Sequence, residues 1–289
     1  VQGTYARDLV PVSRLGPPWG EAEIRAQSDD PSHLSYGALA NAYKAVVEGL
    51  PKKDGTPLYI QVHNEPNLCY EWECSGGGSL DSTTIAAEYA AFFRDVADAL
   101  DAIGDPRIQI SLGALAPGGN VSCECCPESW CAGQPGETGL DFMAKMQAAV
   151  PDIWSRLDYL ASHAYPATNI GWGFFQPYPA SAPGLAYFEQ ELAVVGSELP
   201  VLITETGWST KRPEGGPFPS AAEVATWTVQ AYQEVWLTHP NIKGVMPFML
   251  QDAFWGDQEG FGWVLTDGSK EPVFHQVRDL RCALGLGPC

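Results

Sequence analysis

The chain has 289 residues, 45% of them hydrophobic and 11% aromatic, so it can fill a sizeable core, and intrinsic disorder is excluded. Lys and Arg number 16 against 35 Asp and Glu, which gives a formal net charge of −19 at pH 7. A surface this acidic repels phosphate backbones and anionic lipids, so nucleic acid and membrane surfaces are poor partners. No apolar run in the sequence approaches the roughly 20 residues that a membrane-spanning helix needs.

Short apolar strands alternate with amphipathic helices along the chain. The sequence predicts six strands, over Leu9–Leu15, Leu58–Val62, Ile108–Leu115, Leu157–His163, Val201–Thr204 and Val245–Leu250. Apolar residues at helical spacing predict helices between them, over Leu34–Leu50, Thr84–Ile103, Gly139–Val150, Ala186–Val195 and Ala221–Thr238. No Pro/Ser-rich linker divides the chain, which predicts a single catalytic barrel domain over residues 1–289.

The ends of the strands distinguish two α/β architectures. A Rossmann-type protein should carry GxGxxG after its first strand, and this sequence has none. Polar and aromatic residues instead lie at or just past the carboxyl ends of most strands, namely Arg14, Asn64, Glu65, His163, Tyr165, Glu205 and Trp255. Convergence of such residues onto one face is how a (β/α)₈ TIM barrel builds its site, so we predict a TIM barrel.

The number of predicted strands is two short of a closed barrel. Only eight residues precede Leu9, so we expect the first two β/α units to be absent from this chain. Cleavage, a segment outside this sequence or a partner chain would each account for that absence. Since an open sheet leaves unpaired edges, we expect a partner segment or chain to complete the barrel.

Two glutamates stand out by their positions among the acidic residues. Glycoside hydrolysis needs one carboxyl group that protonates the leaving oxygen and a second that acts as nucleophile or base. Glu65 follows the strand LYIQV in the phrase IQVHNEPN, and Glu205 follows VLIT in VLITETGWST. Because a barrel presents its catalytic groups at the carboxyl ends of strands, this pair predicts the two catalytic carboxyl groups.

The phrases HNEPN, SHAYP, ITETGW and PFMLQDAFW resemble clan A of the retaining glycoside hydrolases, which includes cellulase-, mannanase-, galactanase- and β-xylosidase-type enzymes. The resemblance covers about Leu9 to Leu280. It implies that Glu65, on strand four, is the acid/base and that Glu205, on strand seven, is the nucleophile. It also implies Asn64 as the contact to the sugar 2-hydroxyl, Tyr165 as a hydroxyl donor to the nucleophile, Trp255 as the stacking floor and His163 as the strand-six histidine.

Other side chains near the strand ends add candidates for substrate binding. Sugar rings stack their C–H faces on indole and phenol rings, and we expect Trp172 and Trp255 to bind substrate, with Trp208 as a further candidate. Arg14 either contacts the nucleophile or is an arginine at the edge of the core. His163 either touches the substrate or orients its neighbours. The few His and scattered Asp make no metal cluster and no phosphate loop is visible, so we expect no metal and no cofactor.

Eight cysteines in a chain of this size predict either disulfides or a metal site. They are Cys69, Cys74, Cys123, Cys125, Cys126, Cys131, Cys282 and Cys289. The middle four could hold zinc through thiolates, but they lack two well-spaced CxxC knuckles and a nearby His, which favours disulfides. Asn120 begins a glycosylation sequon beside that group. Together with the even cysteine count, the sequon predicts a secreted protein.

The sequence therefore predicts a secreted retaining glycoside hydrolase that cleaves a β-linked oligo- or polysaccharide, with endo action, by double displacement. The alternative comes from another class: a catalytically inactive carbohydrate-binding or extracellular structural protein on a similar scaffold. The presence of both glutamates, Asn64 and Tyr165 favours the enzyme, whereas the short N-terminus favours the alternative.

Overall fold

The computed structural model describes residues 1–16, 24–72, 81–117, 138–167, 173–211, 218–252 and 256–286, without the side chains of Cys69 and Tyr70. The chain divides into two compact units, and each is described by itself. The first unit comprises Val1–Ala161 and Leu192–Leu199, and the second comprises Ser162–Glu191 and Pro200–Cys289. The single domain expected over residues 1–289 stays a prediction.

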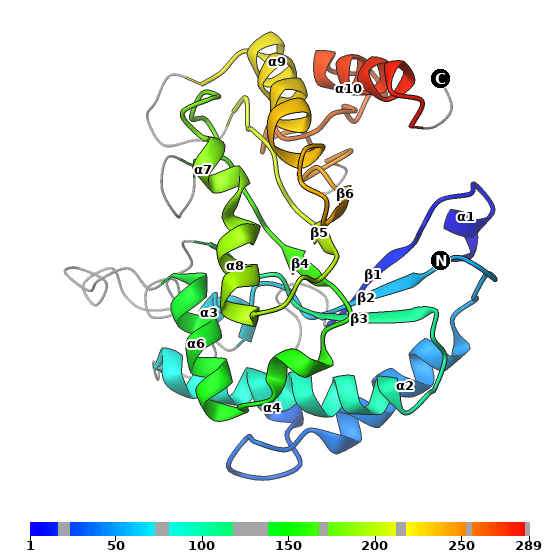
Figure 1. Ribbon diagram of the computed structural model, residues 1–289, viewed down its shortest axis with the longest axis vertical. Coiled ribbons are helices and arrows are strands. Elements are labelled where there is room, and N and C mark those ends of the chain that lie inside the picture. Colours follow the sequence, from blue (N-terminus) through cyan, green and yellow to red (C-terminus); the bar gives the residue numbers. More distant parts are fainter. Residues whose placement is uncertain are drawn as a thin grey trace. The chain divides into compact units, whose positions relative to one another are not determined.

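Strands alternate with helices in both units, which confirms the α/β class (Figure 1). The first unit contains α1 (Gln2–Tyr5), β1 (Val12–Leu15), η1 (Arg25–Gln27), α2 (Gly37–Gly49), β2 (Leu58–Val62), α3 (Cys69–Trp72), α4 (Ser82–Asp101), β3 (Ile108–Leu112), α6 (Gly139–Ala149) and η2 (Ile153–Arg156). β4 (Leu160–Ser162) and α8 (Tyr187–Val195) have residues in both units. The second unit also contains α7 (Ala182–Leu185), β5 (Val201–Ile203), α9 (Ala221–Ala231), the π-helix η3 (Tyr232–Trp236), β6 (Ile242–Val245) and α10 (Pro272–Ala283).

The strands form two small sheets. In the first sheet β1, β2 and β3 are parallel and adjacent in that order, with Val12 opposite Tyr59 and Leu58 opposite Ile108. In the second sheet the order is β4, β5, β6, and β5 pairs with β6 in parallel. The apolar side chains of β2 and all of β5 are buried, as expected for parallel strands covered by helices. Six strands are found among the described residues, and the closed (β/α)₈ barrel stays a prediction.

Five of the six strands are shorter than the apolar pattern predicts. β3 ends at Leu112 rather than 115, β4 covers only Leu160–Ser162 of the predicted 157–163, and β5 ends at Ile203 rather than 204. Proline explains the differences at the other two, β1 and β6. β1 begins at Val12 rather than Leu9, after Pro11, and the predicted strand 245–250 is replaced by β6 at 242–245, with Pro247 beyond its end. Proline has no N–H to donate to a neighbouring strand, so regular pairing stops there. Single hydrogen bonds continue past β6, because the backbone N–H of Phe248 donates to the carbonyl oxygen of Thr206 at 2.8 Å.

Helix α4 is the longest helix of the first unit and packs against α2 and α6. It begins where Asp81 accepts a hydrogen bond from the backbone N–H of Thr84 at 2.9 Å, the capping contact that an Asp at this position favours. Phe92 and Phe93, expected on its apolar faces, are fully buried. The helix covers Ser82–Asp101, two residues ahead of the predicted range at both ends.

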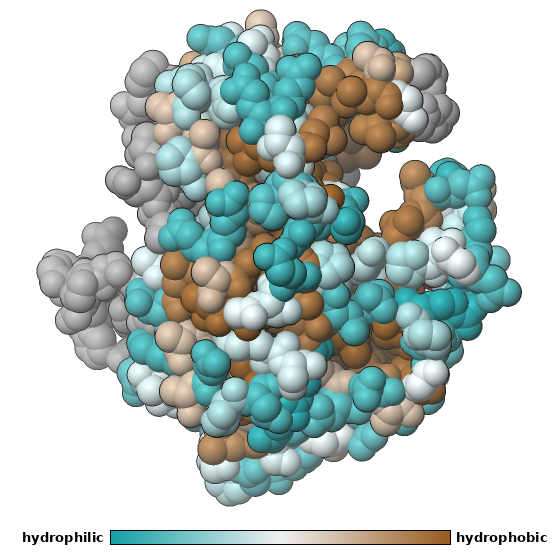
Figure 2. Space-filling model, in the orientation of Figure 1, coloured by the Kyte–Doolittle hydropathy of each residue, from teal (hydrophilic) through white to brown (hydrophobic). Residues whose placement is uncertain are grey.

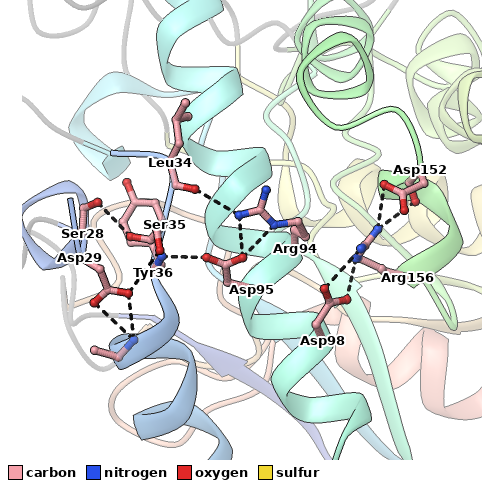
Figure 3. Close-up of polar contacts among 11 residues, drawn as sticks. Ser28, Asp29, Leu34, Ser35, Tyr36, Arg94, Asp95, Asp98, Asp152 and Arg156 are labelled. Carbon is pink, nitrogen blue, oxygen red and sulfur yellow. Dashed lines mark hydrogen bonds and ion pairs between the residues drawn. The ribbon is translucent and has the colours of Figure 1, made fainter. Parts of the chain in front are cut away.

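Charged side chains fasten α4 to the segments beside it (Figure 3). Arg94 donates to the carbonyl oxygen of Leu34 at 3.1 Å, and Asp95 accepts from the backbone N–H of Tyr36 at 2.7 Å. Further along the helix, Asp98 forms an ion pair with Arg156 of η2 at 2.7 Å. These contacts hold α4 against the segment before α2 and against η2 within the first unit.

In the second unit α9 packs against α10. α9 begins with a capping box, in which Ser220 and Glu223 each bond the other's backbone N–H. Cys282, on α10, is disulfide-bonded. The side chains of the other seven cysteines and the residues Asn120, Trp172 and Trp255 lie outside the described part of the chain, so the predictions on them are untested.

Hydrophilic residues are spread widely over the face shown in Figure 2, as the strong net charge leads us to expect. Among the described helices, none combines the length and the apolar character that crossing a bilayer would take.

Candidate functional site

Glu65 lies three residues past the end of β2, where the chain turns off the sheet. His63 and Glu65 both have left-handed backbone conformations, with φ of 76° and 36°, which are uncommon for residues other than glycine. Both neighbouring segments hold this turn. The N–H of His63 donates to the carbonyl oxygen of Leu15 on β1 at 2.6 Å, and the N–H of Glu65 donates to that of Ala114, after β3, at 2.9 Å. Glu65 is thus fixed at the carboxyl edge of the sheet, with 7% of its surface exposed.

Two residues adapt the surrounding backbone to this turn. A Cβ on Gly113 would lie 2.8 Å from the carbonyl carbon of His63, so the close approach of the two segments requires glycine. Asn67, the last residue of the phrase NEPN, is buried and bonds Ala116 twice: it donates to the carbonyl oxygen at 2.7 Å and accepts from the N–H at 3.0 Å. The loop after β2 is therefore clamped to the segment after β3.

Glu71, on the short helix α3, contacts residues at the end of β2. The amide nitrogen Nδ2 of Asn64 donates to Oε1 of Glu71 at 3.3 Å. The ring nitrogen Nε2 of His63 lies 2.8 Å from the backbone carbonyl oxygen of Glu71, and because a carbonyl only accepts, Nε2 carries the proton. Glu71 was missed by the sequence analysis, because the helix that carries it has only four residues, too few to show a periodic pattern.

The charges around Glu71 act in opposite directions. Burial raises the pKa of Glu71 to about 7; the hydrogen bond from Asn64 lowers the pKa, the charge of Glu65 raises it and that of Arg14 lowers it. Burial also lowers the pKa of His63 to about 4, so its ring is neutral at pH 7. Arg14, on β1, is exposed, and its charge acts on both Glu71 and His63.

Glu205 lies two residues past the end of β5, in the second unit. The hydroxyl of Tyr165 donates to Oε2 of Glu205 at 3.1 Å, the contact that the family resemblance implies for this tyrosine. Nδ1 of His163 lies 3.6 Å from the same oxygen. The loop is braced by Thr206, whose hydroxyl donates to the carbonyl oxygen of Ala164 at 2.7 Å. A carboxylate that accepts a phenol hydrogen bond is oriented, and its negative charge is stabilised.

Aromatic packing holds Tyr165 in place. Its ring meets Phe174 edge-on at 4.8 Å between centroids, and Phe261 packs on Phe174 at 5.3 Å and on Phe248 at 5.4 Å. Tyr165, Phe174 and Phe261 are all buried. Such a cluster leaves the Tyr165 ring little freedom to rotate, so its hydroxyl stays directed at Glu205.

Trp208 is buried, and its indole N–H donates to the carbonyl oxygen of Gln176 at 2.8 Å. The ring lies 6.1 Å from that of Trp227. A substrate contact through Trp208 stays a prediction, as do the roles of Arg14 and His163.

Comparison with known proteins finds similarity in structure but not in sequence. No family model matches the chain. No curated protein matches it either.

Solved structures do resemble the chain. A GH128 (subgroup II) endo-β-1,3-glucanase from Sorangium cellulosum is 18% identical with a TM-score of 0.54, over 94% of this chain and 82% of the glucanase. A fungal β-1,4-galactanase is 16% identical with a TM-score of 0.58, over 95% of this chain and 80% of the galactanase. A monomeric β-xylosidase from Caulobacter crescentus CB15 is 19% identical with a TM-score of 0.59, over 97% of this chain. The chain spans 54% of the length of that xylosidase.

The chain shares its fold with these enzymes. This likeness confirms, at the level of fold, the resemblance to clan A glycoside hydrolases that the motifs indicated. At identities below 20% the likeness concerns the fold alone, so the chemistry has to be argued from this chain's own residues.

Proposed function

We propose that the chain is a retaining glycoside hydrolase that cleaves a β-linked oligo- or polysaccharide, with endo action. The observation that carries the proposal is the hydrogen bond from the Tyr165 hydroxyl to Glu205. It orients a carboxylate at the end of a strand, in a fold shared with a glucanase, a galactanase and a xylosidase. Glu65, at the end of another strand, supplies the second carboxyl group that the reaction needs.

The proposed reaction has two displacements. In the first, Glu205 attacks the anomeric carbon while Glu65 gives its proton to the glycosidic oxygen, so that the bond to the leaving sugar breaks and a glycosyl ester forms on Glu205. In the second, Glu65 takes a proton from a water molecule whose oxygen attacks the anomeric carbon and releases Glu205. Asn64 would contact the sugar 2-hydroxyl, and two inversions give net retention.

The remaining expectations belong to the same proposal. The parallel strands and the fold likeness support a (β/α)₈ barrel, in which a partner segment would contribute to closure. The disulfide at Cys282 supports a secreted protein, because disulfides persist in oxidising compartments.

Replacing the proposed nucleophile tests the reaction directly. The purified chain is incubated with β-1,3- and β-1,4-linked oligosaccharides of glucose, mannose, xylose and galactose, and the anomeric protons of the products are followed by NMR. We expect β-products first, and a loss of at least about 1,000-fold in kcat for Glu205→Ala. A 2-deoxy-2-fluoro glycoside should add its sugar mass to the peptide that contains Glu205.

Glu48→Ala serves as the control, because Glu48 is an exposed residue on α2. Its activity should equal that of the wild type. Near-normal turnover by Glu205→Ala would remove Glu205 from the reaction, and α-products at the first time points would replace retention by inversion. Binding of the oligosaccharides without any hydrolysis would support the carbohydrate-binding alternative.

A further inference from the structure

The backbone of Glu71 is held from two sides within the first unit. The protonated Nε2 of His63 donates to its carbonyl oxygen at 2.8 Å. The next residue, Trp72, is buried, and its indole N–H donates to Oε2 of Glu88 on α4 at 3.0 Å. Glu88 is itself paired with Arg25 at 3.0 Å. Glu71 is therefore placed by its neighbours, independently of any contact that its own carboxyl group makes.

The carboxyl group of Glu71 is directed at Asn64. Oε1 accepts from Nδ2 of Asn64 at 3.3 Å, so the NH₂ end of the amide faces Glu71. The other end, Oδ1 of Asn64, is buried and has no hydrogen-bond partner among the described residues. A buried acceptor without a partner is costly, and a hydroxyl group of a bound molecule would satisfy it.

We propose that Glu71 is a positioning residue, which fixes the amide of Asn64 so that Oδ1 is presented to a substrate hydroxyl group. This role rests on the proposed function, since it gives Asn64 a defined orientation beside the acid/base Glu65. Glu71 acts through Asn64 and takes no part in bond cleavage.

The groups that face Glu71 come from three segments. Arg14 acts from β1, His63 and Asn64 from the end of β2, and Glu65 from the turn that follows. Of these, His63 stays neutral above its low pKa of about 4, so its charge does not change near pH 7. Asn64 can then sense the titration of Glu71, with a pKa of about 7, and that of Glu65, which exchanges a proton in the proposed reaction. The part of the response that is lost in Glu71→Gln belongs to Glu71.

NMR of the Asn64 side chain tests the contact without reference to activity. The NH₂ signals of Asn64, assigned by their loss in Asn64→Ala, should shift with a midpoint near pH 7 in the wild-type protein. In Glu71→Gln the signals should persist without this titration, because the oxygen acceptor remains and the charge does not. The proposal is overturned if the shifts of the Asn64 NH₂ signals do not change with pH, or if they change equally in the wild type and in Glu71→Gln.

A double-mutant cycle tests the consequence for the reaction, with the oligosaccharide that the wild type cleaves fastest. Glu71→Ala should lower kcat/KM by roughly tenfold, as expected for the loss of a charged hydrogen bond, and Glu71→Gln should restore most of it. In the Asn64→Ala background, Glu71→Ala should have little further effect. If the losses in kcat/KM from Glu71→Ala and Asn64→Ala multiply in the double variant, the proposal is overturned. Glu48→Gln is the control.

The two arms separate the two proposals. If none of the oligosaccharides is cleaved, the proposed function fails, and the NMR titration still decides whether Glu71 holds Asn64. If cleavage is observed but the cycle shows independent effects, the proposed function stands and the positioning role fails. If Glu71→Ala does not fold, comparing the wild type with Glu71→Gln by NMR still decides whether Glu71 holds Asn64.

Discussion

Glu191 is a buried carboxylic acid that the proposed reaction does not use. It lies on α8 with 1% of its surface exposed, and the hydroxyl of the fully buried Ser162, at the end of β4, donates to its carboxyl group. Burial raises its pKa from the ordinary 4.5 to about 8, against the effect of the Ser162 hydrogen bond. At pH 7 the folded protein therefore keeps this carboxyl group protonated.

This pKa shift predicts how stability depends on pH. Between pH 4.5 and about 8 the folded state holds a proton that the unfolded state has released, so the free energy of unfolding falls as pH rises through this range. Glu191→Gln should remove that part of the slope, and the variant should gain stability relative to the wild type from about pH 5 to about pH 8. Denaturant unfolding at both pH values measures the difference, and parallel pH profiles would contradict the assignment.

Single residues differ in how far the sequence predicts them. Glu65 and Glu205 could be selected because each directly follows an apolar strand, and the resemblance also pointed to Tyr165. Glu71 could not, since it lies on the four-residue helix α3, which has no periodic pattern in the sequence and which folding brings to Asn64. A residue just past a strand with a clear apolar pattern can be placed from the sequence, whereas a residue on a single helical turn cannot.

At the scale of elements, Tyr89 of α4 joins the ends of two strands. Its hydroxyl donates to the carbonyl oxygen of Val62, at the end of β2, at 2.9 Å and accepts from the N–H of Gly113, after β3, at 2.7 Å. The ring and both backbone groups are buried, and the ring lies 6.3 Å from that of His63. The helix thus helps to fix the register of the turn that carries Glu65.

Tyr89→Phe tests this link. Loss of the hydroxyl leaves the buried N–H of Gly113 without its acceptor, and we expect the free energy of unfolding to fall by about 2 kcal/mol. Tyr43→Phe, on α2, is the matched control, because within the described part of the chain no hydrogen bond involves that hydroxyl. Chemical denaturation compares the two variants, and equal stability would show that the hydroxyl of Tyr89 contributes nothing.

The elements themselves were predicted well where their pattern is long and regular. The range of β2 is the predicted one, and α4 is displaced by two residues. β1 and β6 were misjudged because an apolar run continues through Pro11 and Pro247, which have no N–H to donate to a regular strand pair. Leu9, Val10 and Leu250, at the outer ends of these two runs, are exposed, so an apolar run alone marks neither strand pairing nor burial.

At the scale of the whole molecule, the net charge of −19 bears on the choice of polymer. Long-range repulsion slows the approach of polyanions and is screened within about 10 Å at 0.1 M salt. Neutral polysaccharides escape this effect. The proposed substrate class therefore narrows to uncharged β-linked polymers.

Salt dependence tests this expectation. The kcat/KM for a carboxymethylated β-glucan should rise when NaCl is increased from about 20 mM to about 200 mM, whereas that for the unmodified polymer should stay constant. Reducing-end release measures both. Equal responses of the two polymers would show that the net charge has no influence on substrate encounter.

The course of the chain through the two units has a practical consequence for dividing the protein. The backbone leaves the first unit after Ala161, returns for Leu192–Leu199 and leaves again at Pro200. No single cut therefore yields two fragments that each contain one unit. To express the first unit alone, a gene would have to fuse residue 161 to residue 192 through a designed connector, and the second would need its own fusion of 191 to 200.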